Sequence, residues 1–308
     1  MRRGASGLNL LLGIDKPQGM SSHDVVNSVR RALGERRVGH AGTLDPAATG
    51  VLVVGVGQGT RLMGLLTADE KSYIATITFG FETTTDDAEG EPTTYGKTTS
   101  RLRDESYAQR VLDSFLGKQM QIPPAYSAIS VEGKRSYARA RAGETVKMEP
   151  RPVEVRVAQL LRVDDADDAL GWQCAFTVSK GTYVRALARD VGRAVGSAAH
   201  LTRLCRTASG KVTLAQCVSL DRICELGAPA IEKAALDPVS SLGLPMRGLG
   251  DKELRAVVSG RRIDAREASH GQRVALVRDG RLWGVWESDG TTLHAIANFL
   301  DGIAGVES

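Results

Sequence analysis

Short apolar runs and alternating apolar and polar positions predict strands along much of this chain. The runs LNLLLGID (8–15) and GVLVVGV (50–56) predict buried strands, because nearly every position in them is apolar. The alternation in KSYIATITFG (71–80) predicts a half-buried strand. Further strands are predicted at RPVEVRVAQLLRV (151–163) and GWQCAFTVS (171–179), which an acidic turn joins, and at HLTRLCRTASGKV (200–212).

Apolar residues three or four positions apart predict helices between these strands. In SSHDVVNSVRRALG (21–34), Ser21 or Ser22 can cap the first turn and Gly34 ends the helix. The same spacing predicts two more helices, ESYAQRVLDSFLG (105–117) and TYVRALARDVGRAVG (182–196).

Two long stretches show no regular spacing of apolar residues. FETTTDDAEGEPTTYGK (81–97) predicts a polar loop, and IPPAYSAISVEGKRSYARARAGE (122–144) predicts a strand, a turn at Glu132–Gly133 and a short basic helix. Strands and helices therefore follow one another irregularly. This order predicts an α+β fold, with a mixed, largely antiparallel sheet flanked by helices and loops, and not a series of β-α-β units.

The sequence changes character near residue 240. DPVSSLGLPMRGLG (237–250) is rich in proline, glycine and serine, which predicts a linker. Beyond it, Asp279–Gly280 between two apolar runs is a strong signal for a β-hairpin. We therefore expect a main domain over residues 1–240, with a basic insertion near 120–150, and a small β-rich module over 245–308.

The composition, 42% hydrophobic and 25% charged over 308 residues, is that of an ordinary globular protein. No apolar run approaches the ~18 residues that a membrane helix needs, and the basic start lacks a small-residue cleavage site. We therefore expect a cytoplasmic protein without a membrane partner. The net charge is only +4, but basic residues cluster at 30–37, 133–143 and 184–196. One such cluster is usually solvated surface, whereas several favour a face that binds a polyanion.

The cysteines, histidines and glycines do not indicate a metal or a cofactor. The four cysteines form no C-x-x-C pair and have no histidine at zinc spacing, so we expect buried free thiols and no metal. The glycines in VLVVGVGQGTRL (51–62) follow G-x-G-x-G, one residue short of the dinucleotide pattern, and predict a tight turn after a strand. We expect no cofactor.

Asp45 in GHAGTLDP (39–46) is the strongest candidate for chemistry. Pro46 restricts its predecessor to extended conformations, and a carboxylate fixed in a loop can act as nucleophile or base. Asp-Pro is also a common turn start, so other residues must decide between the two interpretations. They are Tyr73 at a strand start, and Tyr183 and Arg185 at a helix start.

Four motifs, in this order along the chain, resemble those of the bacterial TruB-type tRNA pseudouridine synthases. They are LLGIDKPQGMSSHDVV (11–26), RVGHAGTLDPAATGVLVV (37–54), KSYIATITFG (71–80) and SKGTYVRALARDVG (179–192). The resemblance implies the pseudouridine synthase fold and isomerisation of uridine 55 in the tRNA T-loop, where C5 replaces N1 in the bond to ribose. It also implies the T-arm of tRNA as partner and a reaction without cofactor. The tail loosely resembles a PUA-like RNA-binding module, and nothing in the sequence demands a multimer, so we expect a monomer.

The resemblance also implies roles for single residues. Asp45 matches the catalytic aspartate, and Arg185 matches the arginine that pairs with it. His40 matches the residue that helps to extrude the target nucleotide, and Tyr73 matches the tyrosine that stacks on the flipped base. The other matches are Tyr183 and Leu204 as pocket residues, Asp87 as an acidic contact from the polar loop, and Lys16 and Pro17 as support for the active-site loop.

One departure and two alternatives accompany this interpretation. The family's polar loop usually reads T-D-T-x-D, whereas here TTTDD (83–87) has Thr84 at the first aspartate position. One alternative is a protein that binds and remodels tRNA without chemistry, which would need no carboxylate at Asp45. The other is a carboxylate-dependent nucleoside or glycoside hydrolase, which would need a second acid at a suitable position.

Overall fold

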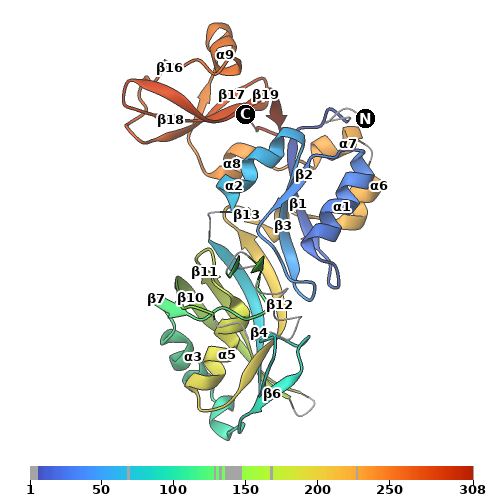
Figure 1. The fold of residues 1–308 in the computed structure, drawn as a ribbon, viewed down its shortest axis with the longest axis vertical. Helices are drawn as coiled ribbons and strands as arrows, with labels where there is room; N and C mark the ends of the chain where they lie inside the picture. Colours follow the sequence, from blue (N-terminus) through green and yellow to red (C-terminus); the bar gives the residue numbers. More distant parts are fainter. Residues whose placement is uncertain are drawn as a thin grey trace. The chain divides into compact units, whose positions relative to one another are not determined.

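The computed structural model describes residues 6–67, 70–127, 130–131, 134–135, 148–166, 169–226 and 228–307. The chain forms two compact units: residues 1–69 with 208–308, and residues 70–207 (Figure 1). Strands and helices are mixed irregularly in both, and most strand pairs are antiparallel. This arrangement confirms the predicted α+β fold.

The sheet of the first unit is covered on both faces, which explains its continuous apolar runs. Strand β1 (Leu10–Lys16) pairs antiparallel with β3 (Thr49–Val56). Successive side chains of a strand point to opposite faces. Leu10 and Leu12 accordingly pack with helices α1 (Ser22–Leu33) and α6 (Leu220–Glu225), whereas Leu11 packs in a cluster with residues of the C-terminal sheet. Strands β14 (Val218–Ser219) and β2 (Val38–Ala41) join β1 and β3.

Helix α1 begins and ends where the sequence predicts. The Ser21 hydroxyl accepts a hydrogen bond from the amide of Asp24, and the Asp24 carboxylate accepts one from the amide of Ser21. Such a capping box satisfies amides that the first turn leaves without partners. Gly34 ends the helix in the left-handed conformation, with φ of 61°.

A five-stranded sheet forms the C-terminal part of the first unit. Its order is β15 (Met246–Gly248), β17 (Arg273–Arg278), β18 (Arg281–Ser288), β19 (Thr292–Ala304) and β16 (Ile263–Asp264), with helix α9 (Asp251–Val258) beside it. Asp279 and Gly280 both have positive φ, 49° and 68°, as a type I′ turn requires, so the predicted hairpin is confirmed. Phe299 and Ile303 share a core cluster with Leu11, so this sheet and the N-terminal sheet pack together.

The predicted linker is wrong in part, because residues 238–242 form helix α8 (Pro238–Leu242). The Asp237 carboxylate caps the amide of Val239, Pro238 starts the helix and Gly243 ends it with φ of 63°. The aspartate, proline and glycine of this stretch therefore serve to begin and end a short helix. The remaining short elements of this unit are η1 (Gly57–Leu62), α2 (Met63–Leu66), β13 (Val212–Thr213), η3 (Leu214–Gln216) and α7 (Ala228–Lys233).

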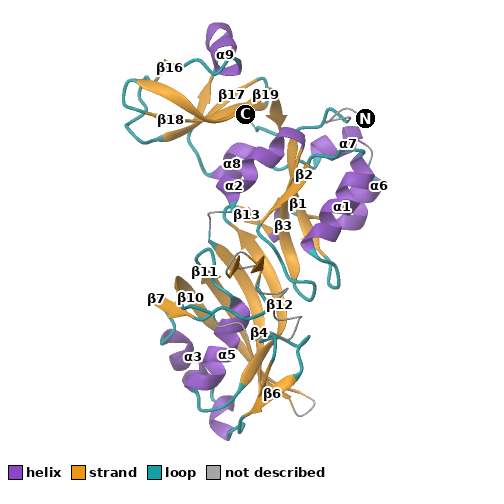
Figure 2. Ribbon diagram, viewed as in Figure 1, coloured by secondary structure: helices purple, strands orange, loops and turns teal. Residues whose placement is uncertain are grey.

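The sheet of the second unit has helices on one face (Figure 2). Its order is β12 (Ala199–Ser209), β4 (Lys71–Phe79), β11 (Ala169–Val178), β10 (Arg151–Ala166) and β7 (Gly117–Gln121). Helices α3 (Glu105–Asp113) and α5 (Val184–Ala194) contribute to the core cluster around Trp172, with η2 (Ser100–Arg103) before α3. The strands predicted at 71–80, 151–163, 171–179 and 200–212 and the helices predicted at 105–117 and 182–196 are thus confirmed. Strand β10 runs through Asp164 and Asp165, which were predicted to be in a turn.

The polar stretch 81–97 is not simply a loop. Strands β5 (Phe81–Thr83) and β6 (Pro92–Tyr95) pair within it, and Thr83, Asp86 and Asp87 are buried. The sequence does not reveal this burial, because the partners of the two aspartates lie about a hundred residues away, on α5. In the stretch 122–144, β8 (Ser130–Val131) and β9 (Lys134–Arg135) form a short hairpin, and the predicted basic helix lies outside the described residues.

The four cysteines, all in the described part of the chain, form no disulfide. The prediction that they are buried is wrong for three of them: only Cys174 is buried, and Cys224 is exposed. Cys174 faces the core from β11, and burial raises the pKa of its thiol to about 12. Among the described residues, no helix is both long enough and apolar enough to cross a membrane.

Candidate active site

Hydrogen bonds on both sides of Asp45 anchor its loop in the first unit. The Ser22 hydroxyl, buried at the start of α1, accepts a hydrogen bond from the amide of Leu44 at 2.8 Å and lies 3.1 Å from the Leu44 carbonyl. On the other side, the amide of Gly19 donates to the carbonyl of Pro46 at 2.8 Å. Leu44 is buried, whereas Asp45 is half-buried. The backbone is thus fixed while the carboxylate stays accessible.

Lys16 is fully buried and binds the same loop. Its ammonium donates to the carbonyls of Pro17 at 2.9 Å, Met20 at 2.6 Å and Pro46 at 3.2 Å. A buried ammonium is costly unless its protons have acceptors, and here three carbonyls surround it. Lys16 therefore ties the segment after β1 to the residue that follows Asp45.

His40 lies on β2 opposite Val54 of β3, in the segment that leads to Asp45. The glycines after β3 have a structural explanation. A Cβ at Gly57 would lie 2.1 Å from the carbonyl oxygen of Leu8, and one at Gly59 would lie 2.3 Å from that of Leu10. They allow a close approach of backbone to backbone, as expected for a tight turn and not for a nucleotide site.

Three of the predicted residues lie in the second unit. Tyr73 on β4 and Leu204 on β12 are partly buried and pack against the cluster around Trp172. Tyr183 precedes α5, and its backbone is held by one side chain: its amide donates to the Gln121 amide oxygen at 2.9 Å, and its carbonyl accepts from the Gln121 amide nitrogen at 3.1 Å. Gln121, at the end of β7, was not predicted to have this role.

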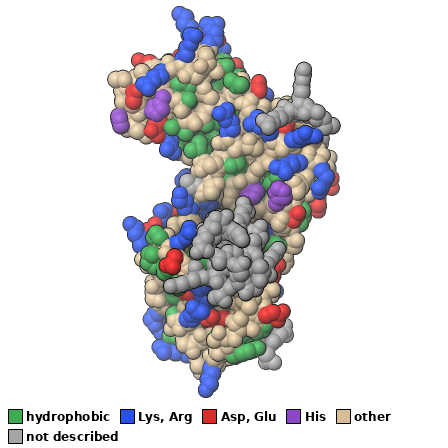
Figure 3. Space-filling model, in the orientation of Figure 1, with side chains coloured by type: hydrophobic (Ala, Val, Ile, Leu, Met, Phe, Trp, Pro, Cys, Tyr) green, Lys and Arg blue, Asp and Glu red, His purple; other side chains and the backbone are tan. Residues whose placement is uncertain are grey.

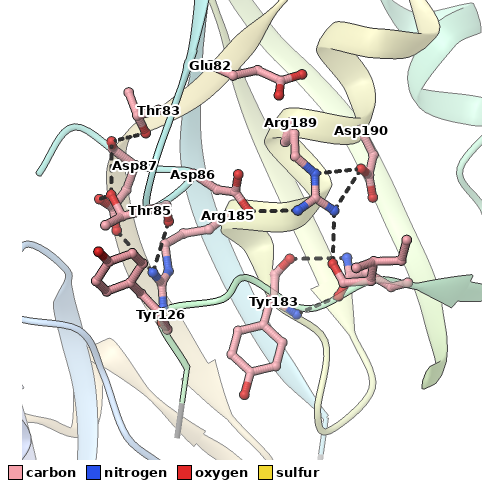
Figure 4. Close-up of polar contacts among 12 residues, drawn as sticks. Glu82, Thr83, Thr85, Asp86, Asp87, Tyr126, Tyr183, Arg185, Arg189 and Asp190 are labelled. Atoms are coloured by element: carbon pink, nitrogen blue, oxygen red, sulfur yellow. Dashed lines mark hydrogen bonds and ion pairs between the residues drawn. The ribbon is translucent and has the colours of Figure 1, made fainter. Parts of the chain in front are cut away.

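Arg185 and Asp87 form a buried ion pair, with 3.3 Å between Nη1 and Oδ2 and side chains 8% and 10% exposed (Figure 4). Arg185 also donates to the carbonyls of Thr85 at 3.0 Å and Tyr126 at 3.1 Å. The amide of Glu89 donates to the Asp87 carboxylate at 3.1 Å. The guanidinium is therefore held between the polar loop and the segment after β7.

A second buried pair, which the sequence did not predict, lies one helical turn further along α5. Arg189 Nη1 is 2.8 Å from Asp86 Oδ2, and Arg189 also contacts Asp190 and donates to the carbonyl of Ile122 (Figure 4). Burial raises the pKa of Asp86 to about 6, and it also raises the pKa of Asp190. Two adjacent aspartates, and two arginines at i and i+4 on a helix, were the signal in the sequence.

The basic cluster at 184–196 is therefore not a surface for polyanions. Arg185 and Arg189 are buried, and both nitrogens of Arg193 that face Glu82 lie 2.7 Å from its carboxylate oxygens. Asp45 belongs to the first unit and Arg185 to the second, so their pairing stays a prediction. Within the described residues, no group of three or more histidines, cysteines or acids is arranged to hold a metal.

Comparison with known proteins adds independent evidence. The model of the TruB family pseudouridylate synthase N-terminal domain matches residues 30–184. The tRNA pseudouridine synthase B of Thermobifida fusca is 46% identical over 280 residues, 89% of this chain and 93% of the relative. That of Mycobacterium tuberculosis strain H37Rv is 40% identical over 284 residues, 92% of this chain and 93% of the relative. The chain belongs to the TruB family of pseudouridylate synthases.

The TruB-family assignment makes this chain an isomerase that forms pseudouridine in RNA. Solved structures support its fold. A chain in a Cbf5–Nop10–Gar1 complex superposes with a TM-score of 0.70 at 22% identity, covering 96% of this chain and 87% of that chain. A chain of an archaeal box H/ACA Nop10–Cbf5 complex superposes with a TM-score of 0.67 at 21% identity, covering 96% of this chain and 86% of that chain. Asp45 and Tyr73 lie within the residues that the family model matches, whereas Lys16, Arg185 and Leu204 lie outside them.

Proposed function

We propose that this chain isomerises uridine 55 in the T-loop of tRNA to pseudouridine, with Asp45 as the reactive carboxylate. Relatives 40–46% identical over most of their length are named tRNA pseudouridine synthase B, which supports tRNA as the substrate. The N1–C1′ bond breaks, the C5–C1′ bond forms, N1 gains a proton and C5 loses one. No electrons pass to an acceptor, so the reaction needs no redox cofactor.

The observation that carries this proposal is the anchoring of the Asp45 loop. Leu44 is held by Ser22, and Pro46 is held by Lys16 and Gly19, so the residues on both sides of Asp45 are fixed by buried groups. A turn without a function would not require a fully buried ammonium, which is costly to desolvate. Such rigidity is what a carboxylate needs if it must meet one atom of an extruded nucleotide.

The remaining candidate site residues are assigned roles in extruding the target base and holding it. Leaving the stack costs a few kcal/mol, which aromatic stacking and base-edge contacts offset. Tyr73 offers its ring at the edge of the core cluster for stacking, and His40 assists extrusion. Tyr183 and Leu204 line the pocket. Arg185, which Asp87 and two carbonyls hold, is the arginine assigned in this proposal to pair with Asp45.

The C-terminal sheet, residues 245–308, supplies phosphate contacts in this proposal. Lys and Arg side chains are spread over the visible surface with acidic side chains among them (Figure 3). Several arginines of this region are already paired: Arg262 with Asp289, Arg266 with Glu253, Arg273 with Glu287 and Arg278 with Asp251. Arg255 and Arg261 are exposed and form no ion pair with the described residues, so they are the better candidates.

A tritium-release assay tests the proposal. A tRNA transcript that carries 5-³H-uridine loses tritium to water only where C5 exchanges its hydrogen for ribose. We expect wild-type protein to release it from position 55, and a transcript with cytidine at that position to release none. Asp45→Asn should abolish release and leave tRNA affinity within a few fold, because most affinity comes from phosphate contacts. Asp221→Asn, an exposed aspartate of the same unit, is the matched control.

Two outcomes would contradict the proposal. Tritium release by Asp45→Asn at a rate near that of wild type would remove Asp45 from the chemistry. Tight binding of tRNA by wild-type protein without any release would favour the alternative of a protein that only binds and remodels tRNA.

A further inference from the structure

Two arginines of α5 bridge the same two segments of the second unit. Arg185 binds the polar loop through Asp87 and Thr85, and it binds the segment after β7 through the carbonyl of Tyr126. Arg189 binds the same loop through Asp86 and the same segment through the carbonyl of Ile122. Figure 4 shows both arginines with their contacts to the polar loop, Arg185 at Thr85 and Arg189 at Asp86. By contacting both segments, Arg189 therefore fixes the distance between the polar loop and the segment after β7, which also hold Arg185.

The backbone of Asp86 is adapted to this arrangement. Its φ is 61°, a left-handed conformation that few residues other than glycine adopt, although aspartate and asparagine tolerate it best. Neighbouring side chains of an extended segment point to opposite sides. The left-handed turn at Asp86 lets both Asp86 and Asp87 reach arginines of one helix. The backbone on either side is held by β12, through bonds from the Leu201 amide to the Asp86 carbonyl and from the Ala88 amide to the Leu201 carbonyl.

The charges of the network do not balance. Four carboxylates, of Glu82, Asp86, Asp87 and Asp190, face three guanidinium groups, of Arg185, Arg189 and Arg193. The imidazole of His200 on β12 is close enough to interact with Asp87, but burial lowers its pKa. Burial raises the pKa of Asp86 to about 6, although Arg189 and Arg185 favour its charged form.

We propose that Asp86 and Arg189 are positioning residues, which hold the polar loop against α5 so that Asp87 keeps Arg185 in its working orientation. They touch neither substrate nor reacting atoms and act through Asp87 and Arg185. The importance of this for catalysis rests on the proposed function, in which Arg185 pairs with Asp45. Holding the loop is a property of the folded protein alone.

Asp86→Asn is the sharpest test, because asparagine tolerates the left-handed backbone and removes only the charge. Amide hydrogen exchange at pH 7.5 reports on positioning without any substrate. We expect residues 83–90 and 122–127 to exchange about tenfold faster than in wild type, and helix α1 in the other unit to be unchanged. Asp165→Asn removes an exposed ion pair with Arg103 in the same unit and should change neither segment. Unchanged exchange in both segments of Asp86→Asn would overturn the proposal.

Single-turnover rates then test the consequence for catalysis. At pH 8 we expect Asp86→Asn to be slower by about tenfold to a hundredfold, with KM within twofold, because a small misplacement of a catalytic group is costly. Equal single-turnover rates of Asp86→Asn and wild type at pH 8 would overturn the proposal.

A second variant and a separate readout keep the result decisive. If Asp86→Asn does not fold, Arg189→Lys keeps the positive charge but cannot hold Asp86 and Ile122 together, and it should show the same loss of rate and protection. Failure of the proposed function would appear separately, as wild-type protein that releases no tritium while the exchange results stand.

Discussion

Substituting Lys16 by methionine should loosen the Asp45 loop and lower activity without touching any residue that meets the substrate. Methionine has nearly the same length and shape but no donors. The change removes three hydrogen bonds, from Nζ to the carbonyls of Pro17, Met20 and Pro46. Pro46 keeps the amide of Gly19 as a donor, whereas Pro17 and Met20 lose the ammonium.

The size of the effect follows from these hydrogen bonds. A hydrogen bond to a charged group contributes about 1.5–3 kcal/mol, so the two bonds to Pro17 and Met20 together contribute about 3–6 kcal/mol. The variant no longer carries a desolvated charge, which offsets part of this loss. We therefore expect the free energy of local opening to fall by about 2–3 kcal/mol, which corresponds to amide exchange about 30- to 150-fold faster.

Amide hydrogen exchange of Gly19 and Leu44 is the direct assay. Gly19 donates to Pro46, and Leu44 donates to Ser22, so both amides report whether the loop is still held. Tritium release should slow by about tenfold to a hundredfold, as expected when a reactive group is misplaced. Lys252→Met, at an exposed position of α9, is the control and should change neither measurement. Wild-type exchange at Gly19 and Leu44 in Lys16→Met would refute the anchoring role of Lys16.

Four further predictions concern pH, backbone, RNA affinity and metals. Burial raises the pKa of Asp86 from 3.8 to about 6, so the folded state holds this proton more tightly than the unfolded state. The free energy of unfolding of wild type, relative to that of Asp86→Asn, should therefore fall as the pH rises from 4 to about 7. Urea unfolding of both proteins at pH 5 and pH 7.5 checks this. Gly280→Ala should lower the free energy of unfolding by about 1 kcal/mol, because residue 280 has a positive φ. Gly248→Ala, where a Cβ would meet open space, should not lower it. The urea midpoints of the two variants test the difference. Replacing Arg255 and Arg261 by glutamine should weaken tRNA binding and reduce the salt slope by about 0.7–0.9 for each phosphate that is no longer neutralised, and an unchanged slope would exclude them. Dialysis against a strong chelator should leave tritium release unchanged, and a decrease restored by a metal, with tRNA folding controlled, would reveal a site that the sequence did not indicate.

Local patterns predicted the regular elements well. The apolar runs of β1 and β3, the spacing and caps of α1 and the Asp279–Gly280 turn depend on neighbours in the sequence, so a short window contains the whole signal. The helix at 238–242 was missed for the opposite reason. Its signals are caps and a proline, which also describe a linker, and the helix is too short for its apolar residues to show a period.

The interactions of the candidate site could not be predicted in the same way. Asp86 and Arg189 are 103 residues apart, and the adjacent aspartates and the arginine spacing on α5 do not by themselves show that the two residues pair. Lysine is rarely fully buried, so composition alone would have placed Lys16 on the surface. Resemblance to a family named Lys16 and Asp87 as site residues, but it did not supply their partners. Those depend on how distant segments meet, which only the tertiary structure records.

Lys16 in the first unit and the two arginines of the second unit hold irregular segments in the same way. Loop backbones lack the regular hydrogen bonds of helices and strands, so side chains must fix them. A serine hydroxyl donates once, whereas an ammonium has three donors and a guanidinium has five, so one buried cation can bind several carbonyls at once. Lys16 binds three carbonyls, and Arg185 binds two and a carboxylate. A neutral amide of similar length, as in Lys16→Gln or Arg185→Gln, brings fewer donors and cannot hold all of these groups. We therefore expect both loops to be more sensitive to loss of donors than to loss of volume. Amide exchange at Gly19 tests this, because Lys16→Gln, which keeps a donor, should accelerate exchange less than Lys16→Met.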